Sequence, residues 1–516
     1  MSRLARFFQP TDNWCALLAG LSLFRISTAA ATVVPNSLFS DHMVLQQQVA
    51  VPVWGRADEG EVITVRFQNQ AVTTTAHGGK WLLKLNKLTA GGPYTMRIEG
   101  SNTVIINDVL VGEVWLCSGQ SNMERQLGPR PGQQPITNWV AEREAANHPQ
   151  IRSYFVPHRF APTPVEEAGG VWAVCSPETV QEFSAVGYFF AQALQMKIKV
   201  PVGILFSASG GTPAEYWTSR ADLENKSELR PLVEEYTSFI SNYPRLLAQF
   251  EAQRPQLTAK FRIDSAVAVQ TGRSGPRRPT PPNKERYIAG LYNAMIKPLQ
   301  PYALKGVCWY QGESNSERPQ QYRALLPAMI SNWRRDWQLG NFPFLIVQIA
   351  PFEYQPPEIR EAQLLVSQRV PNTALVVTTD VGDAYDIHPT NKKPVGQRLA
   401  VAAGGLAYGI TGEYTAPTFE EMRVKGNTVE LTFKHVGKGL TAKGEALRGF
   451  TLAGPDKQFV PAQAIIKGKK VLVSAPGVAQ PVAVRYGWAN VPNVNLFSIE
   501  GLPASPFRTD CTDCDR

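Results

Sequence analysis

The chain has 516 residues, which is long enough for two or three domains at about 150 residues per domain. Hydrophobic residues make up 43% and charged residues 18%, a composition that argues against a disordered chain and against a many-pass membrane protein. The net charge is +9, but the basic residues are scattered, and their densest group, between Arg273 and Arg286, lies among prolines. Because no recognition motif accompanies this charge, we do not expect nucleic-acid binding.

The N-terminus has the outline of a secretory signal peptide, which we place at residues 1–31. Arg3 and Arg6 precede a mainly apolar run, Trp14–Phe24, and small residues follow at Ser27–Ala31. The run is shorter than the roughly 20 residues that cross a bilayer. We therefore expect an exported protein with no membrane insertion after cleavage. The alternative is a disordered N-terminal tail.

The cysteines do not form a pattern typical of metal binding. Cys511-x-x-Cys514 has no second Cys or His pair nearby, whereas a tetrahedral zinc site needs four ligands. Residues 511–516 are interpreted as a surface tail, with no metal and no organic cofactor in the protein. The sequence does not indicate an oligomeric state.

Short runs of alternating apolar and polar residues, separated by glycines, occupy both ends of the chain. Ile63-x-Val65-x-Phe67 and Trp81-x-Leu83-x-Leu85 are examples near the start, and Val429-x-Leu431-x-Phe433 is one near the end. This pattern is typical of antiparallel strands. We predict a β-sandwich domain at residues 36–104 and a second β-sandwich region at 413–510.

The middle of the chain, residues 105–412, has a different pattern. Its apolar runs are continuous, as in strands that are buried on both faces. Between them, residues such as Val186, Phe189 and Phe190 recur at helical spacing. Strands and helices in alternation predict an α/β domain with a doubly wound parallel sheet and helices on both faces. The predicted buried strands are Val109–Cys117, Val202–Ala208, Gly306–Tyr310, Phe344–Ala350 and Leu375–Thr379.

Ser121 is the best candidate for a nucleophile. It follows the apolar run within Gly119-Gln120-Ser121-Asn122-Met123, where a tight turn at a strand end would project its hydroxyl into a cleft. A helix-capping serine is the simpler alternative. A serine nucleophile needs a base, and of the six histidines only His388 directly follows the last buried strand. The alternative for His388 is an ordinary surface histidine.

Two other predicted strand ends carry groups that suit the same site. Gly210-Gly211-Thr212-Pro213 allows close backbone approach to a substrate. Trp309-Tyr310-Gln311-Gly312-Glu313-Ser314-Asn315 supplies amide and hydroxyl groups. Each segment could instead be a plain turn. Four compatible strand ends in one domain nevertheless favour a serine hydrolase site.

These segments resemble the sequence blocks of the sialate O-acetylesterase family, within the SGNH hydrolases. The resemblance extends over roughly residues 36 to 510 and includes Leu38–Gln46, Leu291–Ile296, Asp386–Pro389 and Glu500–Asp510. It implies that Ser121 is the nucleophile and His388 the general base. It also implies an oxyanion hole made by the backbone N–H groups of Ser121 and Gly211 and a side chain of the third block.

The chain departs from the usual SGNH pattern in two places. Gln311 stands where asparagine is expected, with Asn315 as the alternative oxyanion donor. The acid is usually three residues before the histidine, where this chain has Tyr385, so Asp386, Asp383 and Asp380 remain alternatives.

The substrate implied by the resemblance is an O-acetylated sugar. Expected substrate-binding residues are Gln120, Trp217, Trp309 and Glu313, with Tyr216 and Tyr310 as further rings for stacking. Arg125, Arg220 and Arg398 are candidates for pairing with a sugar carboxylate. The alternatives are an acetylxylan esterase or another exported SGNH acyl hydrolase and, in a different class, a non-catalytic carbohydrate-binding protein.

Overall fold

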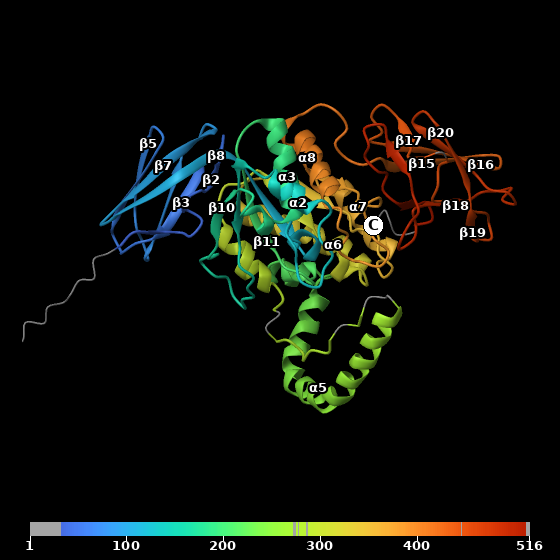
Figure 1. Cartoon of the computed structure of the whole chain (residues 1–516), viewed down its shortest axis with the longest axis horizontal. Coiled ribbons are helices and arrows are strands. Elements are labelled where there is room, and N and C mark those ends of the chain that lie inside the picture. Colours follow the sequence, from blue (N-terminus) through green and yellow to red (C-terminus); the bar gives the residue numbers. More distant parts are fainter. Residues whose placement is uncertain (1–31, 272–274, 277, 285–286, 445, 512–516) are drawn as a thin grey trace, which may run out of the picture.

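The computed structural model describes residues 32–271, 275–276, 278–284, 287–444 and 446–511. The predicted signal peptide and Cys514 lie outside these residues, so both interpretations stay predictions. Within the described ranges, no helix combines the length and apolar character needed to cross a bilayer. Figure 1 shows a central α/β body with antiparallel strands at either end and a helical arm below it.

A mostly parallel sheet forms the centre of the molecule, as the continuous apolar runs predicted. Its strands are parallel except for the edge pair β10 and β9, which is antiparallel. In spatial order the strands are β10 (Val171–Cys175), β9 (His148–Phe155), β11 (Val202–Ala208), β8 (Thr103–Gly119), β12 (Gly306–Tyr310), β13 (Phe344–Val347) and β14 (Thr373–Val376).

Helices cover both faces of this sheet, which confirms the predicted fold class. Alternate residues of β8 enter different cores: Leu116 belongs to the core beneath α6 and α7, and Cys117 to the core beneath α3 and α8. Both faces of the strand are therefore apolar. The four helices are α3 (Ala185–Ile198), α6 (Pro319–Trp337), α7 (Pro357–Arg369) and α8 (Lys393–Tyr408).

The N-terminal strands join the central sheet through β8, whose 17 residues continue across the predicted boundary at residue 104. Its first half pairs antiparallel with β7 and parallel with β2. The N-terminal strands are β1 (Val34–Pro35), β2 (Val44–Gln46), β3 (Val51–Arg56), β4 (Val62–Phe67), β5 (Gln70–Thr75), β6 (Lys80–Leu85) and β7 (Gly91–Glu99).

Antiparallel strands also form the C-terminal region, around a separate apolar core. They are β15 (Thr418–Lys425), β16 (Thr428–Lys434), β17 (Leu440–Ala442), β18 (Phe450–Ala453), β19 (Phe459–Pro461), β20 (Gln463–Lys467), β21 (Lys470–Ser474), β22 (Ala483–Tyr486), β23 (Leu496–Ser498) and β24 (Phe507–Arg508).

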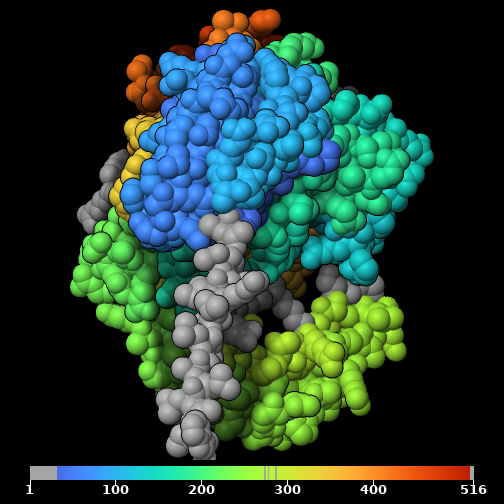
Figure 2. Space-filling model, turned by 90° about the vertical axis from the view of Figure 1, so that its left-hand side faces the viewer, coloured from blue at the N-terminus to red at the C-terminus, as the bar shows by residue number. Residues whose placement is uncertain are grey.

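A helical arm projects from the α/β body. The sequence predicted charged helical segments over residues 220–262, and the structure has α4 (Arg220–Asn225) followed by the 42-residue α5 (Arg230–Thr271). Pro244 and Pro255 lie inside α5, where each removes one backbone hydrogen bond and favours a bend. The helix accordingly folds back on itself in Figure 1, and Figure 2 shows this light-green arm standing off from the body.

The remaining helices are short. β9, which begins at His148, is not among the predicted strands, because its mixed sequence lacks a strong apolar pattern. The short helices are α1 (Ser121–Glu124), α2 (Trp139–Glu144), η1 (Val180–Glu182), η2 (Ala214–Tyr216), η3 (Tyr292–Ile296), η4 (Lys297–Leu299) and η5 (Glu313–Asn315).

Candidate active site

The first three predicted site segments begin side by side at one edge of the central sheet. In the pairing register, Gly119 at the end of β8 lies between Ala208 of β11 and Tyr310 of β12. The chain order reverses around β8, since β11 lies on one side and β12 on the other. Ligand sites of open α/β sheets occur at such a switch point, outside the carboxyl ends of the strands.

Ser121 is the first residue of α1 and is partly exposed. The capping position belongs to Gln120, whose side chain makes no cap hydrogen bond, so Ser121 is not the N-cap that the simpler alternative required. Gly119 allows this turn because its φ is +142° and a Cβ there would come within 2.1 Å of the Tyr310 carbonyl oxygen.

Gly210 lies against Ser121, as close backbone approach requires, and Gly211 follows it. A Cβ built on Gly210 would lie 3.3 Å from the Ser121 Cβ, whereas Gly211, at φ +66°, faces open space. Within the described ranges, the backbone N–H groups of Ser121 and Gly211 donate to no protein acceptor. Two backbone donors with no acceptor among the described residues therefore belong to this turn and to the adjoining glycine segment.

A hydrogen bond brings the loop of His388 to the turn of Ser121. Asn122 Nδ2, in the residue after Ser121, donates to the Ile387 carbonyl oxygen at 3.0 Å. The backbone N–H of His388 donates to Asp386 Oδ1 at 2.8 Å, and the His388 Nδ1 lies 3.8 Å from the same oxygen. Asp386 thus lies beside the imidazole, and a small rotation of its side chain would bring the two groups within hydrogen-bond distance.

The carboxylates of Asp383 and Asp380 interact with groups other than His388. Asp383 Oδ1 accepts the backbone N–H groups of Tyr385 and Asp386, as in an Asx turn. Asp380 makes a bidentate ion pair with Arg398, at 2.7 and 2.6 Å. The geometry favours Asp386 as the partner of His388.

His388 is held towards its neutral form. Burial lowers its pKa below 6.5, and the positive charge of Lys392 lowers the pKa further, while Asp386 raises it. A neutral imidazole can accept a proton, so this environment suits a general base at near-neutral pH.

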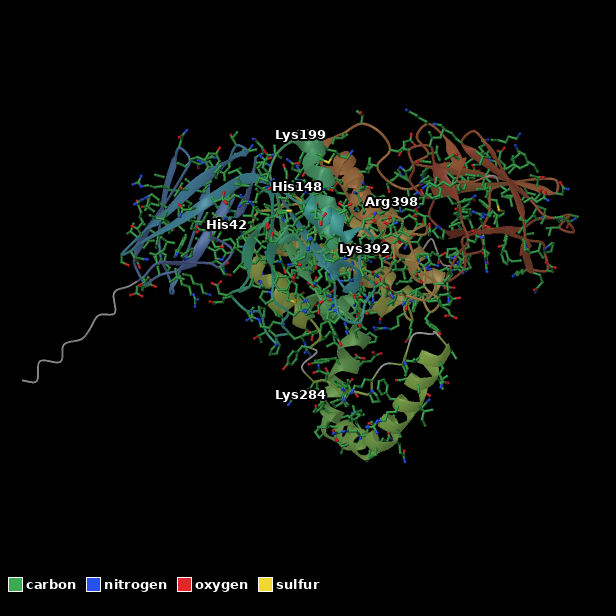
Figure 3. The ribbon with its side chains drawn as sticks, viewed as in Figure 1. His42, His148, Lys199, Lys284, Lys392 and Arg398 are labelled. Carbon is green, nitrogen blue, oxygen red and sulfur yellow. The ribbon has the colours of Figure 1, made fainter. Side chains whose placement is uncertain are left out.

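Three buried polar side chains lie directly beneath the site. Lys392 Nζ donates to Asn122 Oδ1 at 2.5 Å, and Asn122 Nδ2 also donates to Glu313 Oε1 at 2.6 Å. Burial lowers the pKa of Lys392 to about 7 and raises that of Glu313, while their opposite charges favour the ionised forms of both. Asn122 thereby links α1, η5 and the His388 loop; Figure 3 places Lys392 within the α/β body.

Glu313 and Gln120 support this arrangement rather than lying in an open sugar pocket. Glu313 is 7% exposed. Gln120 Oε1 accepts the backbone N–H groups of Gly312 and Ser314, both at 3.3 Å, which fixes the plane of its amide. Its Nε2 has no protein partner within the described part of the chain.

The structure directs the two predicted oxyanion side chains inward. Gln311 is fully buried, and its Nε2 donates to the Thr212 carbonyl oxygen and to Asn315 Oδ1. Asn315 Nδ2 donates to Glu215 at 2.9 Å. In this arrangement both amides form hydrogen bonds within the protein. Their role as oxyanion donors stays a prediction, and it would require these hydrogen bonds to rearrange.

The predicted stacking surface needs correction. Trp217 and Trp309 are both fully buried and pack edge-to-face at 5.9 Å, and Tyr310 is buried as well. These rings belong to the core beneath the site. The sequence did not show this, because aromatic residues near strand ends have the same pattern whether they face solvent or the interior. Only Tyr216 of the four predicted rings is partly exposed.

The arginines proposed to bind a carboxylate are also committed within the protein. Arg125 is buried and donates to the carbonyl oxygens of Gln126, Gly128 and Gln134, while Arg220 pairs with Glu224 and Arg398 with Asp380.

Sequence reasoning missed several groups around Ser121. Lys392 and Asn122 had no distinguishing pattern. The Nε2 of His158 lies 3.1 Å from Glu124 Oε1, and Arg130 lies 3.2 Å from the other oxygen of Glu124, which is three residues after Ser121. No group of three or more metal-ligating side chains occurs in the described ranges.

Comparison with known proteins agrees with this geometry. Residues 282–404 match the family model described as carbohydrate esterase, sialic acid-specific acetylesterase. The crystal structure of a carbohydrate acetylesterase from Xanthomonas citri is 36% identical, covers 93% of this chain and 100% of its own, and superposes with a TM-score of 0.78. The chain belongs to this family of carbohydrate esterases.

Curated relatives extend the similarity over almost the whole chain. The sialate O-acetylesterase of Mus musculus is 26% identical over 91% of this chain and 93% of its own length. That of Homo sapiens is 27% identical over 92% of each. The family resemblance inferred from the sequence is thus confirmed, as is the assignment to the carbohydrate esterases.

Proposed function

We propose that this esterase removes acetyl groups from sugar hydroxyls, with O-acetylated sialic acid as substrate, through an acetyl-serine intermediate. The observation that carries the proposal is the Asn122–Ile387 hydrogen bond, which joins the neighbours of Ser121 and His388. The backbone N–H groups of Ser121 and Gly211, which donate to no acceptor among the described residues, support it, and the names of the relatives supply the substrate class.

His388 takes the proton of Ser121 as the hydroxyl oxygen attacks the acetyl carbonyl carbon. The Ser121 and Gly211 N–H groups stabilise the oxyanion of the tetrahedral intermediate. The intermediate expels the sugar oxygen, which takes the proton from His388. Water, deprotonated by the same base, then releases acetate from the acetyl-serine. Asp386 orients the imidazole and stabilises its protonated form.

We further propose Gln120 Nε2 as the third oxyanion donor, in place of Gln311. Gln120 immediately precedes Ser121, its amide is oriented by two backbone donors, and its Nε2 is uncommitted in the part of the chain that the structure describes. On the composition of residues 1–31, we propose that the protein is exported.

Acetate release from O-acetylated sialic acid and from acetylated xylan tests the function directly. We expect a higher kcat/KM on the sialic acid ester. Preference for xylan would favour the acetylxylan esterase alternative, and absence of acetate release from either would favour the non-catalytic alternative.

Alanine substitutions of Gln120, Gln311 and Asn315 test which of the three amide side chains donates to the oxyanion. Gln120→Ala should lower kcat about 10²-fold, the effect of losing one oxyanion donor. It should also lower the melting temperature, because the backbone N–H groups of Gly312 and Ser314 lose their acceptor, so kcat is the readout that distinguishes the three variants. Gln311→Ala should lower the melting temperature, because it leaves buried polar groups without a hydrogen-bond partner. Each such group lowers the free energy of unfolding by about 1–3 kcal/mol. Asn315→Ala should behave like Gln311→Ala. Normal kcat in Gln120→Ala, with a 10²-fold loss and normal melting in Gln311→Ala, would restore Gln311 as the donor.

The acid limb of the pH profile tests the electrostatic environment of His388. Activity should rise as His388 loses its proton, with a midpoint below pH 6.5 because burial and the Lys392 charge lower its pKa. Lys392 is mostly protonated in this range, since its own pKa is about 7. Lys392→Met removes that charge and should shift the midpoint of kcat/KM to higher pH. An unchanged or lower midpoint in a folded variant would contradict the electrostatic coupling.

A further inference from the structure

A cavity of about 850 Å³ lies between the body and the helical arm, and the catalytic scheme does not use it. The body contributes Glu215, Tyr216 and Arg318, and α5 contributes Glu235, Tyr236 and Phe239. Its volume is within the range of small-molecule sites, about 300–1,000 Å³, and far larger than an acetyl group requires.

Two observations place the cavity near the catalytic turn. Along the chain, Tyr216 is six residues after Gly210, which contacts Ser121, so the two lie no more than about 22 Å apart. Through space, the Phe160 ring packs edge-to-face on Tyr216 at 5.8 Å, and His158, two residues earlier, pairs with Glu124 of α1. These contacts place the cavity near the catalytic turn, within the span of a glycan larger than one sugar unit.

The lining suits neutral sugars. Tyr216, Tyr236 and Phe239 are all partly exposed rings, which can pack against the C–H faces of sugar units, while carboxylates can accept hydrogen bonds from hydroxyl groups. Arg318 is already paired with Glu215 at 2.7 Å, and Glu235 has no ion pair within the described ranges. The described lining thus carries two carboxylates and one guanidinium, which favours neutral sugar units over acidic ones.

We propose that this cavity is a subsite for the neutral sugar units attached to the acetylated residue, and that the arm serves to build its outer wall. The inference rests on the proposed function. It assigns the acetylated sugar to Ser121 and the rest of the glycan to the space between Tyr216 and α5.

Two matched substrate pairs test the subsite: O-acetylated sialic acid with O-acetylated sialyllactose, and O-acetylated xylose with O-acetylated xylohexaose. We expect kcat/KM to be at least 10-fold higher for the larger member of at least one pair, mainly through KM. Tyr236→Ala and Phe239→Ala should reduce this ratio at least 5-fold. Tyr236→Phe keeps the ring and should preserve the ratio, as should Phe250→Ala, a control on the same helix outside the cavity lining.

Ratios near one for both pairs in the parent enzyme would overturn the subsite while leaving the esterase function intact. So would an unchanged ratio in both alanine variants. Absence of acetate release from all four sugars, with p-nitrophenyl acetate still hydrolysed, would contradict the proposed function and the subsite with it. Melting temperatures of the variants distinguish loss of the subsite from loss of the arm.

Discussion

Ser121→Ala should reduce acetate release at least about 10³-fold while the protein remains folded. The hydroxyl makes no hydrogen bond to the described residues, and α1 is capped at Gln120, so removing the oxygen deletes no stabilising contact. Catalysis, in contrast, loses the atom that forms the acetyl ester. Residual turnover would come from water attacking a carbonyl that the remaining donors still polarise.

The measurement is acetate release under saturating substrate, with circular dichroism and the melting temperature as folding controls. Ser118→Ala is a matched control, because this serine is three residues earlier on β8 and fully buried. Parent-like turnover in Ser121→Ala would exclude Ser121 as the nucleophile.

Asp386→Ala should lower kcat about 10³-fold, the second-largest effect that we expect. The carboxylate must hold the imidazole in the correct tautomer and stabilise it once it is protonated. Asp386 lies 3.8 Å from His388 Nδ1 and also binds the backbone N–H of His388, so its removal affects both the charge and the position of the ring.

Asp383→Ala and Asp380→Ala are the matched comparisons for this prediction. Asp380→Ala leaves Arg398 without its bidentate partner and should affect stability more than kcat. Asp383→Ala removes two turn hydrogen bonds and should have a modest effect on both. If Asp386→Ala retains parent-like kcat and one of the others loses it, the acid has been assigned to the wrong aspartate.

Much of the fold could be predicted because its strands differ in their patterns. Strands buried on both faces, such as β11 and β12, are continuous apolar runs, and the N-terminal strands alternate. β9 was missed because its sequence, His-Pro-Gln-Ile-Arg-Ser-Tyr-Phe, has neither pattern. Its pairing with β11 depends on residues far away along the chain.

The site residues whose position depends on the local sequence could be predicted. Those whose role depends on burial in the folded protein could not. Ser121 and His388 follow strand ends, so topology alone places them at one edge of the sheet. The burial of Trp309 and the inward hydrogen bonds of Gln311 depend on helix packing, which no local pattern reveals. Lys392 was missed for a related reason, since a lysine four residues after a histidine normally lies in solvent.

We propose that Ser121 carries the acetyl group during turnover. This proposal is tested most directly by reacting the protein with a fluorophosphonate and locating the modified residue by peptide mass spectrometry. We expect loss of acetate release in proportion to labelling, with the label on Ser121 and none incorporated by Ser121→Ala. Labelling of another residue that accounts for the inactivation, or equal labelling of Ser121→Ala, would contradict the proposal.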